Sequence, residues 1–163
     1  MTRQSFSLAS CYKGWDEYQY HLVQALAPLS SEQLALRAAP HLRSVSLIAR
    51  HIIGARARWL SNTLKLGDED LVSLGTWDDP GHPVLSAADL VRGLETTWRV
   101  IQDALRRWTI ADLEAVFHDK DEQGEEETFT RQWVIWHLIE HDVHHGGEIS
   151  FTLGMHRLAA VAL

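Results

Sequence analysis

A run of histidines near the C-terminal end of the chain has the spacing of a metal-binding site. His137, His141, His144 and His145 lie within nine residues and are four of the chain's ten histidines. The pairs His137/His141 and His141/His145 are each four residues apart, so on an α-helix both members of a pair lie on one face. Two neutral imidazoles one helical turn apart can bind the same transition-metal ion. The pattern indicates a metal site on a helix, and the spacing alone leaves both pairs open.

Two ligands leave a metal ion undercoordinated, so a third ligand is expected from another part of the chain. His51 is the candidate, because it lies in an apolar segment, Leu47 to Gly54, that has the periodicity of a helix. The alternative is a hydrogen-bonded core histidine that binds no metal. Three histidines with an open fourth position are typical of a catalytic site, since water or a substrate can take that position.

Four long helices are predicted to position these histidines. Hydrophobic periodicity and capping residues predict helices from about Phe6 to Ala27, from about Val45 to Leu64 with an end near Gly67, from Ser86 to Leu105, and from Thr130 or Arg131 to about Gly154. A long acidic loop is expected over 67–83, and a short β-hairpin over 116–130 before the last helix. The expected fold class is therefore all-α, a four-helix bundle whose site lies between facing helices.

Two further features bear on packing. Gly146 and Gly147 inside the last helix each cost roughly 1 kcal/mol relative to alanine, which indicates close approach by another helix or by a ligand. Four of the chain's seven tryptophans fall at helical positions compatible with the bundle interior, where packing in the core is expected: Trp59, Trp98, Trp133 and Trp136.

The composition limits the classes of function. A length of 163 residues predicts one domain, 1–163. The formal net charge of −7, with scattered Lys and Arg, argues against nucleic acid and anionic membranes as partners. The lone Cys11 excludes an internal disulfide. Since no apolar run is long enough to span a bilayer and no signal-peptide pattern is present, a cytoplasmic protein is expected.

Two segments resemble the DinB/YfiT-like metal-binding four-helix bundles. They are Arg43 to His51, RSVSLIARH, and Trp136 to Ile149, WHLIEHDVHHGGEI. The resemblance covers nearly the whole chain. It implies that one histidine of the second helix and an i,i+4 pair of the last helix bind a divalent metal ion, which selects His51, His141 and His145. His137 and His144 then lie beside the site.

The resemblance also implies a function: a metal-dependent enzyme, with Zn²⁺ or Ni²⁺ as the expected ion. The ion would activate water, as in a hydrolase, or a low-molecular-weight thiol such as bacillithiol or mycothiol, as in a thiol transferase. A small-molecule substrate and a homodimer are expected. The alternative is a non-catalytic metal-binding stress-response protein whose ion stabilises the bundle.

The chain departs from the family's usual Arg-Gly-Gln ending after the last histidine, because it has Gly146-Gly147-Glu148 there. The change removes a cation that could hold an anionic group near the metal. Glu148 could orient a ligand imidazole or act as a base toward metal-bound water. His137 could shuttle a proton. The alternative for Glu148 is an ordinary helical glutamate.

Overall fold

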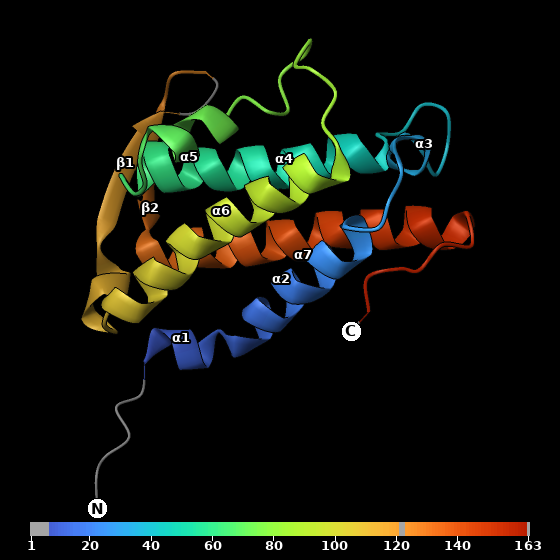
Figure 1. Cartoon of the computed structure of the whole chain (residues 1–163). Helices are drawn as coiled ribbons and strands as arrows, with labels where there is room; N and C mark the ends of the chain where they lie inside the picture. Colours follow the sequence, from blue (N-terminus) through green and yellow to red (C-terminus); the bar gives the residue numbers. More distant parts are fainter. Residues whose placement is uncertain (1–6, 121–122, 163) are drawn as a thin grey trace, which may run out of the picture.

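The computed structural model describes residues 7–120 and 123–162. Its long helices are α2 (Lys13–Leu26), α4 (Val45–Arg58), α6 (Ala87–Arg107) and α7 (Arg131–Met155), as Figure 1 shows. They confirm the predicted all-α bundle. The predicted helix start at Phe6 and two turn residues of the predicted hairpin, Asp121 and Glu122, lie outside the described residues.

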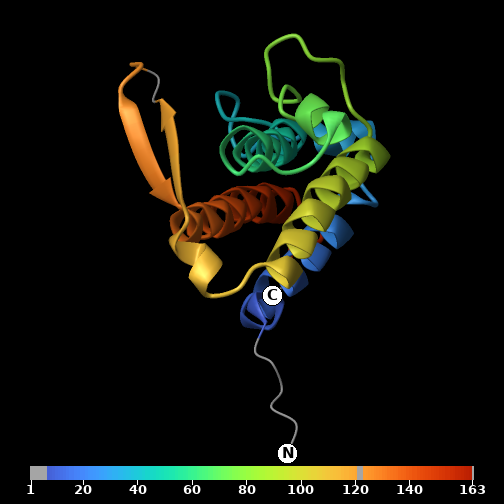
Figure 2. The same cartoon turned by 90° about the vertical axis from the view of Figure 1, so that its left-hand side faces the viewer.

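Shorter elements connect the long helices. They are α1 (Leu8–Cys11), α3 (Ser31–Leu34), a π-helical turn η1 (Trp59–Thr63), α5 (Glu69–Leu74), a 3₁₀ turn η2 (Ala111–Glu114), β1 (Val116–Lys120) and β2 (Glu126–Thr130). The two strands pair antiparallel, with Val116 opposite Thr130 and Lys120 opposite Glu126, which confirms the predicted hairpin. Figure 2 shows the hairpin on the opposite side of α4 and α7 from α2 and α6.

Side-chain caps explain where the site-bearing helices begin. The Ser44 hydroxyl accepts the backbone N–H of Leu47 at the start of α4, and the Thr130 hydroxyl caps α7 in the same way. Ser86 opens α6 with the reciprocal bonds of a capping box, as its sequence predicts. Each cap satisfies backbone donors that have no partner inside the helix.

Two predictions about the elements were wrong. The first helix is interrupted at Tyr12, which separates α1 from α2. The loop expected over 67–83 contains α5, because the Asp68 carboxylate caps the Leu71 N–H, and Leu71 and Leu74 bury their side chains in the core. A six-residue helix with only two buried positions gives too little periodicity to detect.

The core lies between the four long helices. Fully buried side chains come from each of them, including Leu22, Leu26, Ile52, Ile53, Leu90, Leu94, Leu138 and Ile149. Trp98 is buried as predicted, but Trp133 and Trp136 are 41% and 60% exposed, so that prediction was wrong for both. No helix within the described residues is long and apolar enough to cross a membrane.

At Gly146 the side chain of Tyr18 from α2 packs closely against the backbone of α7. A Cβ atom at position 146 would lie 2.0 Å from Tyr18 Oη, whereas one at position 147 would meet nothing within 4 Å. The prediction of a close approach is thus confirmed for Gly146 and wrong for Gly147.

Candidate metal centre

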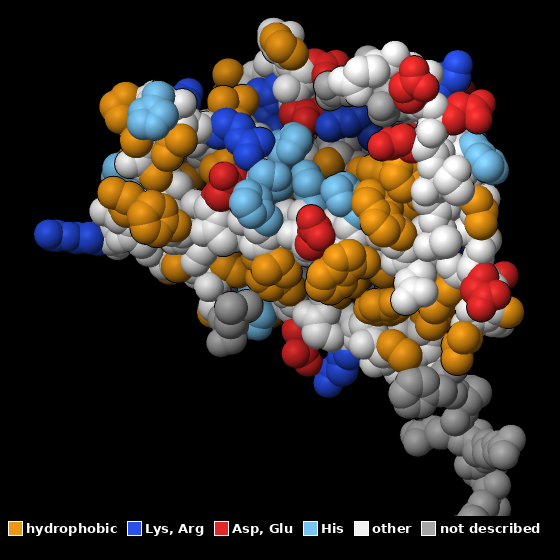
Figure 3. All heavy atoms as spheres, turned by 180° about the vertical axis from the view of Figure 1, so that it is seen from behind, with side chains coloured by type: hydrophobic (Ala, Val, Ile, Leu, Met, Phe, Trp, Pro, Cys, Tyr) orange, Lys and Arg blue, Asp and Glu red, His pale blue; other side chains and the backbone are white. Residues whose placement is uncertain are grey.

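Three histidines from α4 and α7 converge on the face of the bundle shown in Figure 3. The ring centroid of His51 lies 4.9 Å from that of His141 and 4.8 Å from that of His145, and the two α7 rings are 4.4 Å apart. One nitrogen of each ring lies within 4.8 Å of the others. We call these residues the histidine trio. They meet because α4 packs against α7 and the α7 pair is one turn apart.

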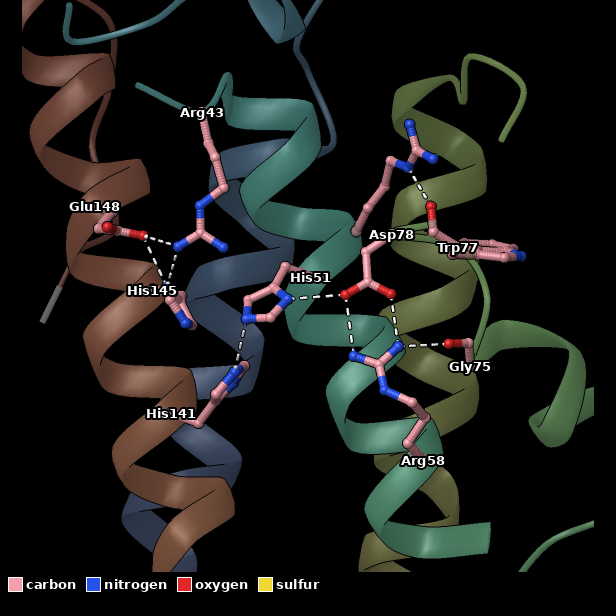
Figure 4. Close-up of polar contacts among 10 residues, drawn as sticks. Arg43, His51, Arg58, Gly75, Trp77, Asp78, His141, His145 and Glu148 are labelled. Atoms are coloured by element: carbon pink, nitrogen blue, oxygen red, sulfur yellow. Dashed lines mark hydrogen bonds and ion pairs between the residues drawn. The ribbon is translucent and has the colours of Figure 1, made fainter. Parts of the chain in front are cut away.

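The carboxylate of Asp78 orients His51 from the side that faces away from His141 and His145 (Figure 4). Asp78 Oδ2 lies 2.8 Å from Nδ1 of His51, which leaves Nε2 facing His141. Arg58 donates to both oxygens of Asp78, at 2.6 and 3.0 Å. Burial alone would raise the pKa of Asp78, but the bonds from Arg58 and His51 lower it below its usual value. Asp78 is therefore an ionised acceptor that fixes the tautomer of His51.

Glu148 contacts His145 in the way that Asp78 contacts His51, through the Nδ1 atom of the ring. Its Oε2 lies 2.7 Å from His145 Nδ1 and accepts a bond from Arg43 Nη2 at 3.1 Å. Burial opposes ionisation of Glu148, but the His145 bond and the charge of Arg43 lower its pKa overall. Of the two roles expected for Glu148, the contacts correspond to orientation of an imidazole.

The two α7 histidines of the trio, His141 and His145, are held in the uncharged form that metal ligation requires. Burial, together with repulsion from His145 and His51, lowers the pKa of His141 to about 3. Burial also lowers the pKa of His145, although its bond to Glu148 opposes the shift. At neutral pH both α7 rings therefore keep a lone pair available.

The distance between the facing nitrogens of His51 and His141 fits a shared transition-metal ion. Nε2 of His51 and Nε2 of His141 are 3.2 Å apart. Two nitrogens on one tetrahedral zinc ion, each bonded at about 2.0–2.1 Å, would be about 3.3 Å apart. The other nitrogen of His141, Nδ1, is buried without a hydrogen-bond partner among the described residues.

A second group of side chains has the donor types for a metal but a less suitable environment. Atoms of His144, His145 and Glu148 also lie close enough to share an ion. The Arg43 guanidinium is bound to Glu148, however, and a fixed cation there opposes a second one. The histidine trio is the better candidate.

Comparison with known proteins identifies the family. A family profile described as DinB superfamily matches residues 15–149, a range that contains the whole trio. The chain belongs to the DinB superfamily. The crystal structure of a DinB-like protein from Bacillus cereus has a TM-score of 0.73 to this fold at 22% identity, covering 96% of this chain and 97% of that one. At this identity the likeness shows the fold. No curated protein gave a significant match.

Arg43 places a positive charge near His145, because its Nη2 lies 3.3 Å from His145 Nδ1. The residue after this histidine is Gly146, and Tyr18 leaves no room there for a side chain. The guanidinium of Arg43 reaches Glu148 from just before α4. The sequence contains this residue in its first DinB-like segment, but nothing in the pattern indicates its contact.

The two flanking histidines have different surroundings in this DinB fold. His137 stacks on Trp133, and its ring centroid is 6.1 Å from that of His141, so it lies beside the trio without joining it. His144 is 69% exposed, with Nε2 4.0 Å from Glu148 Oε1. Neither ring belongs to the trio, whereas Asp78, which sequence reasoning missed, contacts it directly.

A buried ion pair joins α4 to α7 one position after His141. Arg56 Nη2 donates to Asp142 Oδ2 at 2.7 Å, and both side chains are fully buried. Trp15 Nε1 donates to the same oxygen at 2.7 Å, and Arg56 Nη1 donates to Gln19 Oε1 at 2.8 Å. Residues of α2, α4 and α7 are thus held together beside the trio.

Proposed function

We propose that this DinB-superfamily chain is a divalent-metal-dependent enzyme. His51, His141 and His145 would bind one Zn²⁺ or Ni²⁺ ion, and a water or a low-molecular-weight thiol would take the remaining position. Such an ion supplies Lewis acidity, which lowers the pKa of a water or thiol toward neutrality. The convergence of three imidazoles from α4 and α7 carries this proposal.

The surroundings of the trio favour an open site over a closed structural one. The trio offers three ligands where a tetrahedral ion takes four. The side chain of His51 is 30% exposed, so small molecules can reach the trio from solvent. Figure 3 shows histidine side chains at the surface on this face of the molecule.

The chain's own residues would prepare the ligands before an ion binds. Asp78 and Glu148 would accept the Nδ1–H groups of His51 and His145, which makes Nε2 of each ring the candidate ligand atom. Outer carboxylates of this kind fix ring orientation and raise ligand basicity. In this role Glu148 is a positioning residue. Proton transfer by Glu148 or His137 stays a prediction from the sequence, as do the homodimer and the cytoplasmic location.

Elemental analysis tests the ligand assignment. Protein prepared without a polyhistidine tag and dialysed against zinc should retain about one ion per chain. The variants His51→Ala, His141→Ala and His145→Ala should each lose most of it. His144→Ala is the matched control, because that ring neighbours the trio but is exposed. Full retention in the trio variants, or equal loss in the control, would contradict the assignment.

A structural role for the ion is the second candidate, because the trio joins α4 to α7. Thermal unfolding with and without a chelator separates the two functions. Loss of turnover in a hydrolysis or thiol-transfer assay with a small change in Tm supports the enzyme. A large fall in Tm for a protein without turnover supports the structural ion.

A further inference from the structure

Four aromatic rings form a cluster that reaches the histidine trio through His137: Trp59, Phe129, Trp133 and His137. We call them the aromatic wall. His137 and Trp133 stack with their planes 7° apart and their centroids 5.0 Å apart. Trp59 meets Phe129 and His137 edge to face, at 5.2 and 5.0 Å. His137 continues the wall to His141, at 6.1 Å.

The wall is assembled from three separate elements. Trp59 belongs to the π-helical turn η1, Phe129 to strand β2, and the other two rings to α7. π-Helical turns are rare and frequently lie at functional sites. The hairpin has no catalytic candidate of its own, but it brings Phe129 to 4.7 Å from the ring of Trp133. The π-helical turn and the hairpin therefore each contribute one ring to the wall.

The rings of the wall stay accessible. Trp133 is 41% exposed, and the other three are half-buried. Figure 3 shows hydrophobic side chains directly beside the histidines. Exposed apolar rings gathered on one face are unfavourable in water and often mark a ligand-binding surface. A ring from a ligand would add to the stacked and edge-on contacts already present.

A small cavity lies at the η1 and hairpin end of the wall. Its volume is about 220 Å³, and Trp59 and Phe129 line its apolar side. Lys120 contributes a positive charge to its lining, and Asp119 and Glu127 contribute two negative ones, whereas the charge of Arg58 is already paired with Asp78. Its size and its negative charges favour a small ligand group without a negative charge.

The two ends of the trio differ in chemistry. Next to His145, the Arg43–Glu148 ion pair is already formed. Next to His141, the neighbour is the wall, whose first ring is His137. The rings toward His137 can therefore accommodate a planar, apolar part of a bound molecule.

We infer that the aromatic wall binds the body of the substrate: a small planar molecule, aromatic or otherwise unsaturated, with no negative charge on that body, whose donor atom reaches the trio. The inference rests on the proposed function for the position of the donor atom. The affinity of the wall for a ring does not depend on the ion, so the two proposals fail separately.

Two hydroxamates with the same chelating group test the inference. Benzohydroxamate carries a phenyl ring where acetohydroxamate carries a methyl group. By titration calorimetry, zinc-loaded protein should bind benzohydroxamate about tenfold more tightly, the effect of one favourable ring contact. Trp133→Ala should reduce this ratio to less than about threefold, while Trp133→Phe, which keeps a ring, should retain most of it.

Trp136→Ala is the matched control, since Trp136 is on the same helix, is 60% exposed and lies outside the wall. It should leave the ratio unchanged. An equal ratio for the two probes, or an equal loss in the two alanine variants, would overturn the inference. Circular dichroism shows whether each variant is folded, and the ratio of the two probes on the unaltered protein carries the test if Trp133→Ala is not.

The metal-free protein provides a second readout. In ¹H–¹⁵N spectra, the indole N–H signals of Trp59 and Trp133 should shift with benzohydroxamate and not with acetohydroxamate. If neither probe binds zinc-loaded protein by calorimetry but these signals still shift, the metal assignment fails and the wall stands. If acetohydroxamate binds and the indole signals do not respond to benzohydroxamate, the wall fails alone.

Discussion

Replacing Asp142 by leucine should severely destabilise the metal-free protein. Asp142 is fully buried and accepts hydrogen bonds from Arg56 and Trp15. Asp142→Leu leaves the guanidinium charge buried without its counter-ion. Breaking a buried pair in this way costs about 3–5 kcal/mol. This is a large part of the about 5–15 kcal/mol that stabilises a typical domain.

The double variant Arg56→Met/Asp142→Leu isolates the contribution of the charges. It removes both ions, and apolar replacement of a buried pair is often neutral or stabilising. Trp15 and Gln19 then lose their partners, at about 1–3 kcal/mol for each unsatisfied group. We expect the double variant to be more stable than either single variant, with a coupling free energy of about 3 kcal/mol.

Urea unfolding followed by far-UV circular dichroism measures these free energies by linear extrapolation. Glu17→Leu is the control, because it breaks the exposed ion pair with Lys13 and should change stability by less than about 0.5 kcal/mol. The reasoning is refuted if the double variant loses the sum of the single effects, or if Asp142→Leu costs less than about 1 kcal/mol.

Three further predictions follow from contacts near the trio. Gly146→Ala should lower the free energy of unfolding in urea by about 1–3 kcal/mol, because the added Cβ would meet Tyr18. Gly147→Ala should instead stabilise α7 by about 0.5–1 kcal/mol. Equal changes in the two variants would contradict the contact between Gly146 and Tyr18. Asp78→Asn should weaken zinc affinity about 10–100-fold in a competition assay with a chelating dye, and unchanged affinity would show that the carboxylate does not support its histidine. The metal-free protein should lose stability as the pH falls from about 6.5 toward 3. The unfolded chain takes up a proton in this range, whereas folded His141, with its pKa lowered to about 3, does not. His141→Leu should flatten this part of the Tm–pH curve, and an unchanged slope would contradict the pKa shift.

The convergence of the trio could be predicted because it depends on regular geometry. An i,i+4 pair occupies one face wherever a helix forms, and the DinB-like segments placed His51 on a facing helix. The helix boundaries near Ser44, Ser86 and Thr130 could also be located, since each has a side chain that caps the backbone.

The residues that support the trio could not be predicted from the sequence. Asp78 lies in an acidic segment with several equivalent carboxylates, and only the path of the chain after α5 brings it to His51. The contact of Arg43 with Glu148 spans 105 residues, so no local pattern indicates it. Trp133 and Trp136 are of a residue type that usually packs in the core, but both side chains are exposed. Helical periodicity alone does not decide which apolar positions of a helix face outward.

Anomalous diffraction at the zinc absorption edge tests the central claim most directly. Crystals grown with one equivalent of zinc should show a peak about 2.0–2.1 Å from one nitrogen of each of His51, His141 and His145. A peak between His144 and Glu148 instead, or none at the trio with the ring of His51 turned toward solvent, would contradict the account.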